Sequence, residues 1–125
     1  MGISSSSRLG LRINPLVGGG AIAQLSTATA KSKFGIPLTD ATRAEILTYF
    51  QENSFLNGLM LHVGSTGMAV DTMTEGIAIV NALANEVDAV VGEAGGRIRY
   101  IDIGGGLSAN SDCDERKVTF EGKCV

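Results

Sequence analysis

Hydrophobic positions along the chain form one long periodic stripe and several short continuous runs. The stripe consists of Met73, Ile77, Val80, Ala84, Val87 and Val91. These residues recur at steps of three and four, which is the spacing of a helix face that packs against a sheet. Gly92 follows the last of them and is typical of a helix end. The pattern therefore predicts a long helix that includes 73–91 and ends at Gly92.

A second, shorter helix is predicted from Thr39 or Asp40 to about Gln51. Either residue can act as the N-cap because its side-chain oxygen can accept from the free amides of the first turn. Thr42 and Glu45 have the spacing of a capping box. We expect this helix to begin within one residue of position 40.

Short runs rich in apolar residues at 9–14, 58–64 and 98–103 are predicted to be strands, and each is closed by proline or glycine. The run 58–64 is continuously apolar, as is typical of a buried strand. The segment 31–37 reads as a turn. The order is therefore strand, helix, strand, helix, strand, and both helices are long enough to serve as crossovers. This order predicts an α/β fold with a parallel sheet and right-handed connections.

Polar groups follow each predicted strand near its carboxyl end. Arg12 and Asn14 lie near the end of the first strand, His62 and Ser65 at the second, and Gly104–Gly106 at the third. Parallel sheets bind ligands at this edge, because the carboxyl ends of their strands lie together. The sequence therefore predicts a site there.

Each of these groups also has a purely structural interpretation. The glycine triplet can present amides to a phosphate or simply form a tight turn. His62 can be a core histidine bonded to a carbonyl, although Ser65 beside it favours a site role. Arg12 suits a structural ion pair or a ligand site equally well. Asp102 can be a buried charge or point into the helix layer, and it is left out of the site.

Composition narrows the possible classes of protein. With 44% hydrophobic and 18% charged residues the chain is globular, and its net charge of -3 argues against nucleic-acid binding. No apolar run is long enough to span a membrane. Cys113, Cys124 and a single histidine cannot form a standard zinc site, so we expect no metal. Residues 1–8 are serine-rich and not apolar, unlike a secretory signal, so we expect free thiols and a reducing compartment. These features predict a soluble, cytoplasmic protein.

Four ordered motifs resemble one enzyme family. They are Leu11–Pro15, Ser32–Gly35, Leu61–Ser65 and Ile101–Leu107. In order and spacing they are similar to the ornithine, diaminopimelate and arginine decarboxylases. The resemblance implies an alanine-racemase-like (β/α)8 TIM barrel that binds pyridoxal 5'-phosphate, and a homodimer in the complete enzymes. We expect residues 9–110 to form part of this barrel, 1–8 to be disordered and 111–125 to be a polar tail.

The resemblance also implies roles for individual residues. His62 would stack on the cofactor ring, Ser65 and the amides of Gly104, Gly105 and Gly106 would bind its phosphate, and Arg12 would lie near it. Lys33 would lie toward the dimer interface. The reaction implied is decarboxylation of a basic or diamino acid, as in polyamine or lysine biosynthesis, with the pyridine ring as electron sink.

Two family residues have no counterpart in these motifs. The Schiff-base lysine belongs to a strand that precedes position 9, and the acidic partner of the pyridine nitrogen belongs to a later strand. We therefore expect the chain alone to be inactive, as a segment of a longer decarboxylase. A non-catalytic, regulatory homologue and an unrelated phosphate-binding α/β domain are the alternatives. Three strands cannot close a barrel, so we also expect open sheet edges and either marginal stability or self-association.

Overall fold

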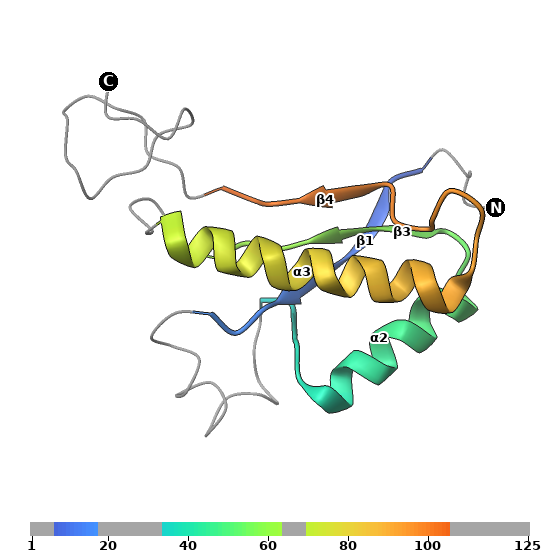
Figure 1. Ribbon diagram of the computed structural model, residues 1–125, viewed down its shortest axis with the longest axis horizontal. Coiled ribbons are helices and arrows are strands. Elements are labelled where there is room, and N and C mark those ends of the chain that lie inside the picture. Colours follow the sequence, from blue (N-terminus) through green and yellow to red (C-terminus); the bar gives the residue numbers. More distant parts are fainter. Residues whose placement is uncertain (1–6, 18–33, 64–69, 106–125) are drawn as a thin grey trace.

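A four-stranded parallel sheet and two helices make up the computed structural model (Figure 1), which describes residues 7–17, 34–63 and 70–105. The strands are β1 (Leu9–Asn14), β2 (Ile36–Pro37), β3 (Leu56–Met60) and β4 (Tyr100–Asp102), and the helices are α2 (Asp40–Glu52) and α3 (Val70–Val91). The sheet order is β2-β1-β3-β4, and every pair is parallel. The expected α/β class and parallel sheet are confirmed.

The strand boundaries differ from the sequence prediction in three places. β3 begins at Leu56, two residues before the predicted start, and β4 is shorter than the predicted run over 98–103. β2 was predicted as a turn. Its two residues pair with Ile13 and Asn14 of β1 at one edge of the sheet. An edge position tolerates Pro37, because proline lacks the amide that a central strand would need.

Helix α2 begins at Asp40 with Thr39 as its N-cap, which confirms the predicted start, but its capping box lies one turn before the predicted pair. Thr39 is the N-cap, and its hydroxyl oxygen accepts from the amide of Thr42 at 3.2 Å. The amide of Thr39 in turn donates to the hydroxyl oxygen of Thr42 at 2.9 Å. The predicted pair of Thr42 and Glu45 was wrong, because the N-cap position fixes the third helical residue as its partner.

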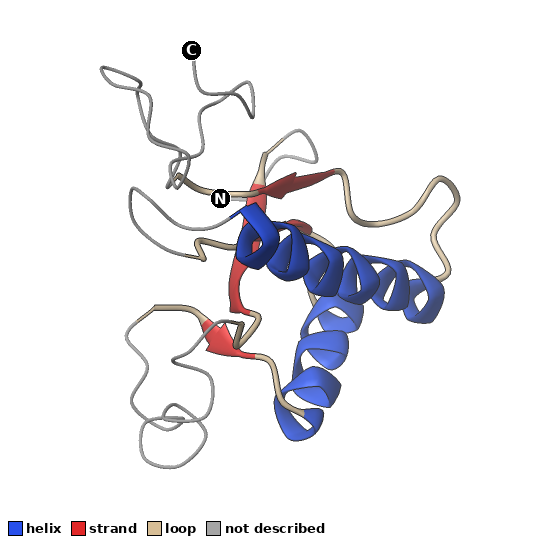
Figure 2. Ribbon diagram, turned by 60° about the vertical axis from the view of Figure 1, so that its left-hand side comes forward, coloured by secondary structure: helices blue, strands red, loops and turns tan. Residues whose placement is uncertain are grey.

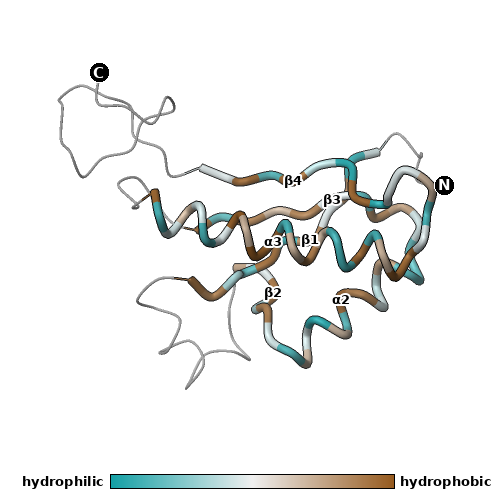
Figure 3. Tube along the Cα trace, in the orientation of Figure 1, coloured by the Kyte–Doolittle hydropathy of each residue, from teal (hydrophilic) through white to brown (hydrophobic). Residues whose placement is uncertain are grey.

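The hydrophobic core lies between the sheet and the two helices (Figure 2). It consists of Ile13, Ile46, Phe50, Leu56, Leu59, Leu61, Val80, Leu83, Ala84 and Val87. Side chains of a strand alternate between two faces, so Leu11 and Ile13 of β1 and Leu59 of β3 turn toward the helices. The register between β1 and β3 shifts at Leu9 and Gly10, and Leu56, at the start of β3, also lies in the core. Hydrophobic and hydrophilic positions alternate along both helices (Figure 3), as expected for elements that cover one face of a sheet.

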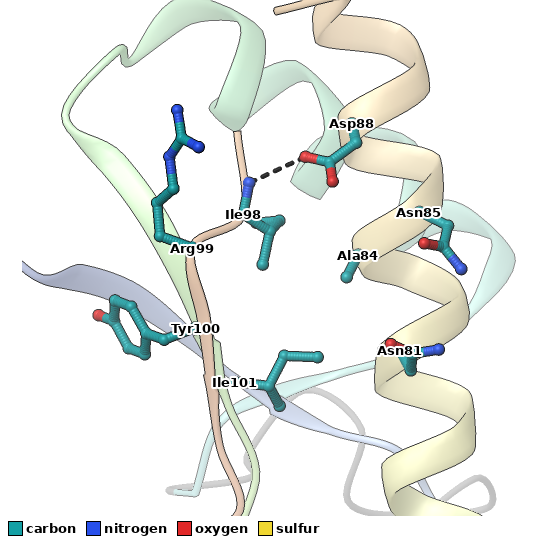
Figure 4. Close-up of a pocket in the computed structure, with 8 residues that line it drawn as sticks. All are labelled: Asn81, Ala84, Asn85, Asp88, Ile98, Arg99, Tyr100 and Ile101. Atoms are coloured by element: carbon teal, nitrogen blue, oxygen red, sulfur yellow. Dashed lines mark hydrogen bonds between the residues drawn. The ribbon is translucent and has the colours of Figure 1, made fainter. Parts of the chain in front are cut away.

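From Gly10 in β1 and Gly58 in β3 onward, the other face of the sheet carries the even-numbered positions. The strand register places Gly10, Gly58 and Tyr100 in one row across three strands. A Cβ atom at Gly58 would lie 2.1 Å from Cζ of Tyr100, so the tyrosine ring lies on the glycine backbone. Tyr100 points away from α3 and Ile101 points toward it (Figure 4). No described helix covers this second face, which we call the open face.

The loop between α3 and β4 joins three elements. Oδ1 of Asp88 on α3 accepts from the amides of Arg97 and Ile98 at 2.6 and 2.8 Å. The Arg97 guanidinium donates to the carbonyl oxygens of Phe50 and Asn53 at 2.9 and 3.3 Å. It therefore satisfies carbonyls at the end of α2 that a helix leaves without partners. Within the three described stretches, neither helix is long and apolar enough to cross a membrane.

Candidate functional site at the carboxyl edge of the sheet

The carboxyl ends of β3 and β4 bring two of the predicted site features together. The amide of Leu61 donates to the carbonyl oxygen of Asp102 at 2.8 Å, which extends the pairing beyond the last residue of β3. One residue further, the amide of Gly105 donates to Nδ1 of His62 at 3.1 Å. His62 and the glycine turn therefore lie in direct contact, although 43 positions separate His62 from Gly105.

The His62 side chain is exposed, so it is not a buried core histidine. Its Nδ1 accepts a hydrogen bond, and in a neutral imidazole the other nitrogen, Nε2, then carries the proton. The contact with Gly105 also fixes the direction of the ring. An oriented, exposed imidazole at a strand end can lie against a flat aromatic ligand.

Gly104 has a conformation and a position that only glycine suits. Its φ is 72°, in the left-handed region. A Cβ atom there would lie 2.7 Å from Nδ1 of His62 and 2.7 Å from the carbonyl oxygen of Leu61. Gly104 therefore allows the turn to approach the imidazole closely.

Asp102 holds this turn through its side chain. Its Oδ1 accepts from the amide of Gly104 at 2.8 Å. The residue is exposed, and its place in one register row with Arg12 and Met60 puts it on the open face. The expectation of a buried charge or of a side chain in the helix layer was wrong, because strand alternation turns Ile101 toward the helices instead.

Arg12 lies on the open face, where its described contact is with an aromatic ring. Its Cζ atom is 5.4 Å from the centroid of the Phe34 ring, a cation–π contact. No ion pair among the described residues includes Arg12. Gly35 has a φ of 86°, and a Cβ atom there would lie 2.9 Å from the carbonyl oxygen of Arg12. Glycine thus lets the chain pass against β1.

The remaining predicted site residues, Ser65, Gly106 and Lys33, lie outside the described residues, as do Cys113 and Cys124. Asn14 is described, and its Oδ1 accepts from the amide of Leu16 at 3.0 Å.

Two residues near this edge were not predicted from the sequence as part of the site. Asp102 stands two positions before Gly104. An aspartate side chain at this spacing often accepts a hydrogen bond from the backbone amide two residues later. That signal could have identified it. Phe34 is the partner of Arg12, and no local pattern in the sequence pairs the two.

A groove of about 230 Å³ lies elsewhere, between α3 and β4 (Figure 4). Its walls are formed by Asn81, Ala84, Asn85, Asp88, Ile98, Arg99, Tyr100 and Ile101. It includes neither His62 nor the glycine turn. The chemistry-bearing groups at the carboxyl edge are therefore separate from this groove.

The carboxyl edge suits a ligand that is both aromatic and anionic. An exposed imidazole provides a flat surface, the glycine backbone next to it provides amide donors, and Arg12 on the same face provides positive charge. No lysine occurs in the described part of the chain, so no described side chain can form a Schiff base there.

Comparison with known proteins identifies the family. The sequence model of the pyridoxal-dependent decarboxylases, pyridoxal binding domain, matches residues 2–123. The chain is 29% identical over 105 residues to a diaminopimelate decarboxylase of Aquifex aeolicus, a match that covers 84% of the chain and 24% of that protein. It is 32% identical over 101 residues to the diaminopimelate decarboxylase of Bacteroides thetaiotaomicron, covering 81% of the chain and 25% of that protein.

A third relative is the diaminopimelate decarboxylase of Deinococcus radiodurans, with 30% identity over 110 residues, 86% of the chain and 26% of that protein. The chain thus spans about a quarter of the length of the curated relatives that it matches. No solved structure matches it significantly. The family match confirms the resemblance and the cofactor, pyridoxal phosphate, inferred from the four motifs. The chain belongs to the pyridoxal-dependent decarboxylase family, within its pyridoxal-binding domain.

Proposed function

We propose that the carboxyl edge of this sheet holds the ring and the phosphate of pyridoxal phosphate. In this proposal His62 lies against the ring, and the turn at Gly104 and Gly105 lies at the phosphate. The observation that carries it is the 3.1 Å hydrogen bond between the Gly105 amide and His62 Nδ1, which brings an aromatic surface and a backbone donor to one point. A phosphorylated aromatic ring requires both.

The two described amides of the turn already have partners within the chain. Gly104 donates to Asp102, and Gly105 donates to His62. The Gly105 amide can serve a phosphate oxygen only if its bond to His62 opens. Since an anionic acceptor makes a stronger hydrogen bond than a neutral imidazole, this exchange is favourable. Opening it also leaves the imidazole free to turn toward the ring.

Three further residues complete the proposed site on the strength of the family motifs. Ser65 and Gly106 would contribute hydrogen-bond donors to the phosphate. Arg12, which contacts the Phe34 ring, would lie near the cofactor. Lys33 is proposed for the interface of a cytoplasmic homodimer. Free thiols at Cys113 and Cys124 would suit that reducing compartment.

We further propose that the protein containing this segment decarboxylates a diamino acid. The support is the similarity to proteins named diaminopimelate decarboxylase. Bound pyridoxal phosphate accepts the electron pair that remains when such a substrate loses carbon dioxide. The described residues would bind and orient the cofactor, and they include no lysine that could form its Schiff base. Because the family's Schiff-base lysine has no counterpart in the four motifs, we propose that this chain does not catalyse the reaction by itself.

Titration of the chain with pyridoxal phosphate, followed by absorbance, tests the proposal. We expect saturable binding, weakened about tenfold or more in His62→Ala and Gly104→Ala, a loss equivalent to about 1.4 kcal/mol. Gly104→Ala places a methyl group against the imidazole and the Leu61 carbonyl. Borohydride treatment and peptide mass analysis should detect no lysine of this chain reduced onto the cofactor.

Gly92→Ala is the matched control. Its φ of 65° is close to that of Gly104, yet a Cβ atom there meets nothing within 4 Å. It therefore imposes similar backbone strain away from the site, and its affinity for pyridoxal phosphate should equal that of the wild type. Equal binding by Gly104→Ala and Gly92→Ala, or no binding by the wild type, would contradict the proposal.

A further inference from the structure

We propose that Asp102 is a positioning residue of the cofactor site. Its carboxylate holds the glycine turn in the conformation that presents the Gly105 amide to His62 and, on binding, to the phosphate. This inference rests on the proposed cofactor site, and it concerns a residue that itself need not touch the cofactor.

Asp102 connects the strand ends through two of its oxygens. Its backbone carbonyl accepts from the amide of Leu61 at 2.8 Å, and its Oδ1 accepts from the amide of Gly104 at 2.8 Å. The first bond fixes the chain just before His62. The second fixes the start of the turn. The next amide, that of Gly105, then reaches His62 Nδ1.

No other described interaction accounts for the carboxylate. Asp102 forms no ion pair within the described residues, and its side chain is exposed, so packing does not require it. The turn that it holds has a φ of 72° at Gly104. This conformation is only one of the many that an unrestrained glycine adopts. A local hydrogen bond that selects this state lowers the ordering cost of binding a ligand there.

Charge and hydrogen bonding make opposite predictions for Asp102. A carboxylate beside a phosphate site repels the phosphate, so an electrostatic role alone predicts tighter binding when the charge is removed. A positioning role predicts weaker binding when the acceptor oxygen is removed. Asp102→Asn keeps an acceptor oxygen without the charge, whereas Asp102→Ala removes both. The two variants therefore separate the two roles.

The first measurement uses the chain without any ligand. Since the chain contains a single histidine, the coupling between the Gly105 amide nitrogen and His62 Nδ1 can be assigned by NMR without ambiguity. We expect Asp102→Ala to speed amide exchange at Gly104 by about tenfold, as loss of one hydrogen bond predicts, and to reduce this coupling. Asp102→Asn should preserve both signals. Asp71→Ala, on the exposed first turn of α3, is the control that should change neither.

The second measurement is the affinity for pyridoxal phosphate. We expect about tenfold weaker binding in Asp102→Ala, and wild-type or tighter binding in Asp102→Asn. Unchanged exchange at Gly104 in Asp102→Ala, or tighter binding by both variants, would overturn the inference. If the wild type fails to bind while the exchange effect is present, Asp102 does hold the turn and the proposed cofactor function is the part that fails.

Discussion

The two faces of this sheet differ in almost every property. On the face that the helices cover, Leu59 and Leu61 are fully buried and Ile13 is 1% exposed. On the open face, Met60 is half-buried and His62 is exposed, although both alternate with those leucines along one segment. Parallel sheets are usually buried on both sides. The difference indicates that the covered face provides the stability of this segment, while the open face carries its polar chemistry.

The largest effect should come from a substitution on the covered face. Leu59→Ala removes a fully buried side chain from the core and should lower the free energy of unfolding by about 2–5 kcal/mol. The neighbouring substitution Met60→Ala should cost less than about 1 kcal/mol, because this side chain keeps contact with solvent and leaves a smaller unfilled space. Urea denaturation followed by circular dichroism measures both.

This pair tests the comparison directly, since the two residues are adjacent and belong to the same strand. Equal losses of stability in the two variants would show that the open face is packed as tightly as the covered one. The conclusion that the covered face provides the stability would then be wrong.

A smaller effect should come from the row of glycines on the open face. Gly58→Ala places a methyl group 2.1 Å from Cζ of Tyr100, so the ring must move. Forced repacking of this kind costs about 1–3 kcal/mol in the free energy of unfolding. In a Tyr100→Ala background the same substitution should cost less than half as much, because the obstructing ring is gone.

The double-mutant cycle of Gly58 and Tyr100 sharpens the comparison by locating the tight contact. A coupling near zero would mean that the tyrosine ring does not rest on this glycine. The open face would then lack even this one closely packed row.

The covered face was largely predictable from the sequence. The helix stripe that begins at Met73 follows from a periodicity of 3.6, and the strands follow from short apolar-rich runs closed by proline or glycine. Both patterns record which side chains are buried. Prediction failed for β2, because two residues that include Pro37 carry no periodic signal. The capping box was predicted one turn too late, at Thr42 and Glu45, because several threonines and acidic residues in that region satisfy the same spacing.

The candidate site was predictable only in part. His62 and the glycine turn were identified from their places at strand ends, and the structure brings them together. Their hydrogen bond depends on the relative register of β3 and β4, which neither strand encodes alone. The contact between Arg12 and Phe34 likewise depends on how the chain returns to β1. Contacts across the sheet are set by tertiary pairing, and local patterns do not contain them.

The smallest effect concerns the rim of the covering layer, where Arg43 of α2 forms an ion pair with Glu86 of α3. Both side chains are more than a third exposed, at 37% and 38%, so water and salt screen the pair. A double-mutant cycle of Arg43→Met and Glu86→Gln should give a coupling of about 0.2–1 kcal/mol, which decreases in high salt. A coupling above about 2 kcal/mol, the range of desolvated charge pairs, would contradict this. The helices would then depend on this ion pair as well as on the buried core to stay on the sheet.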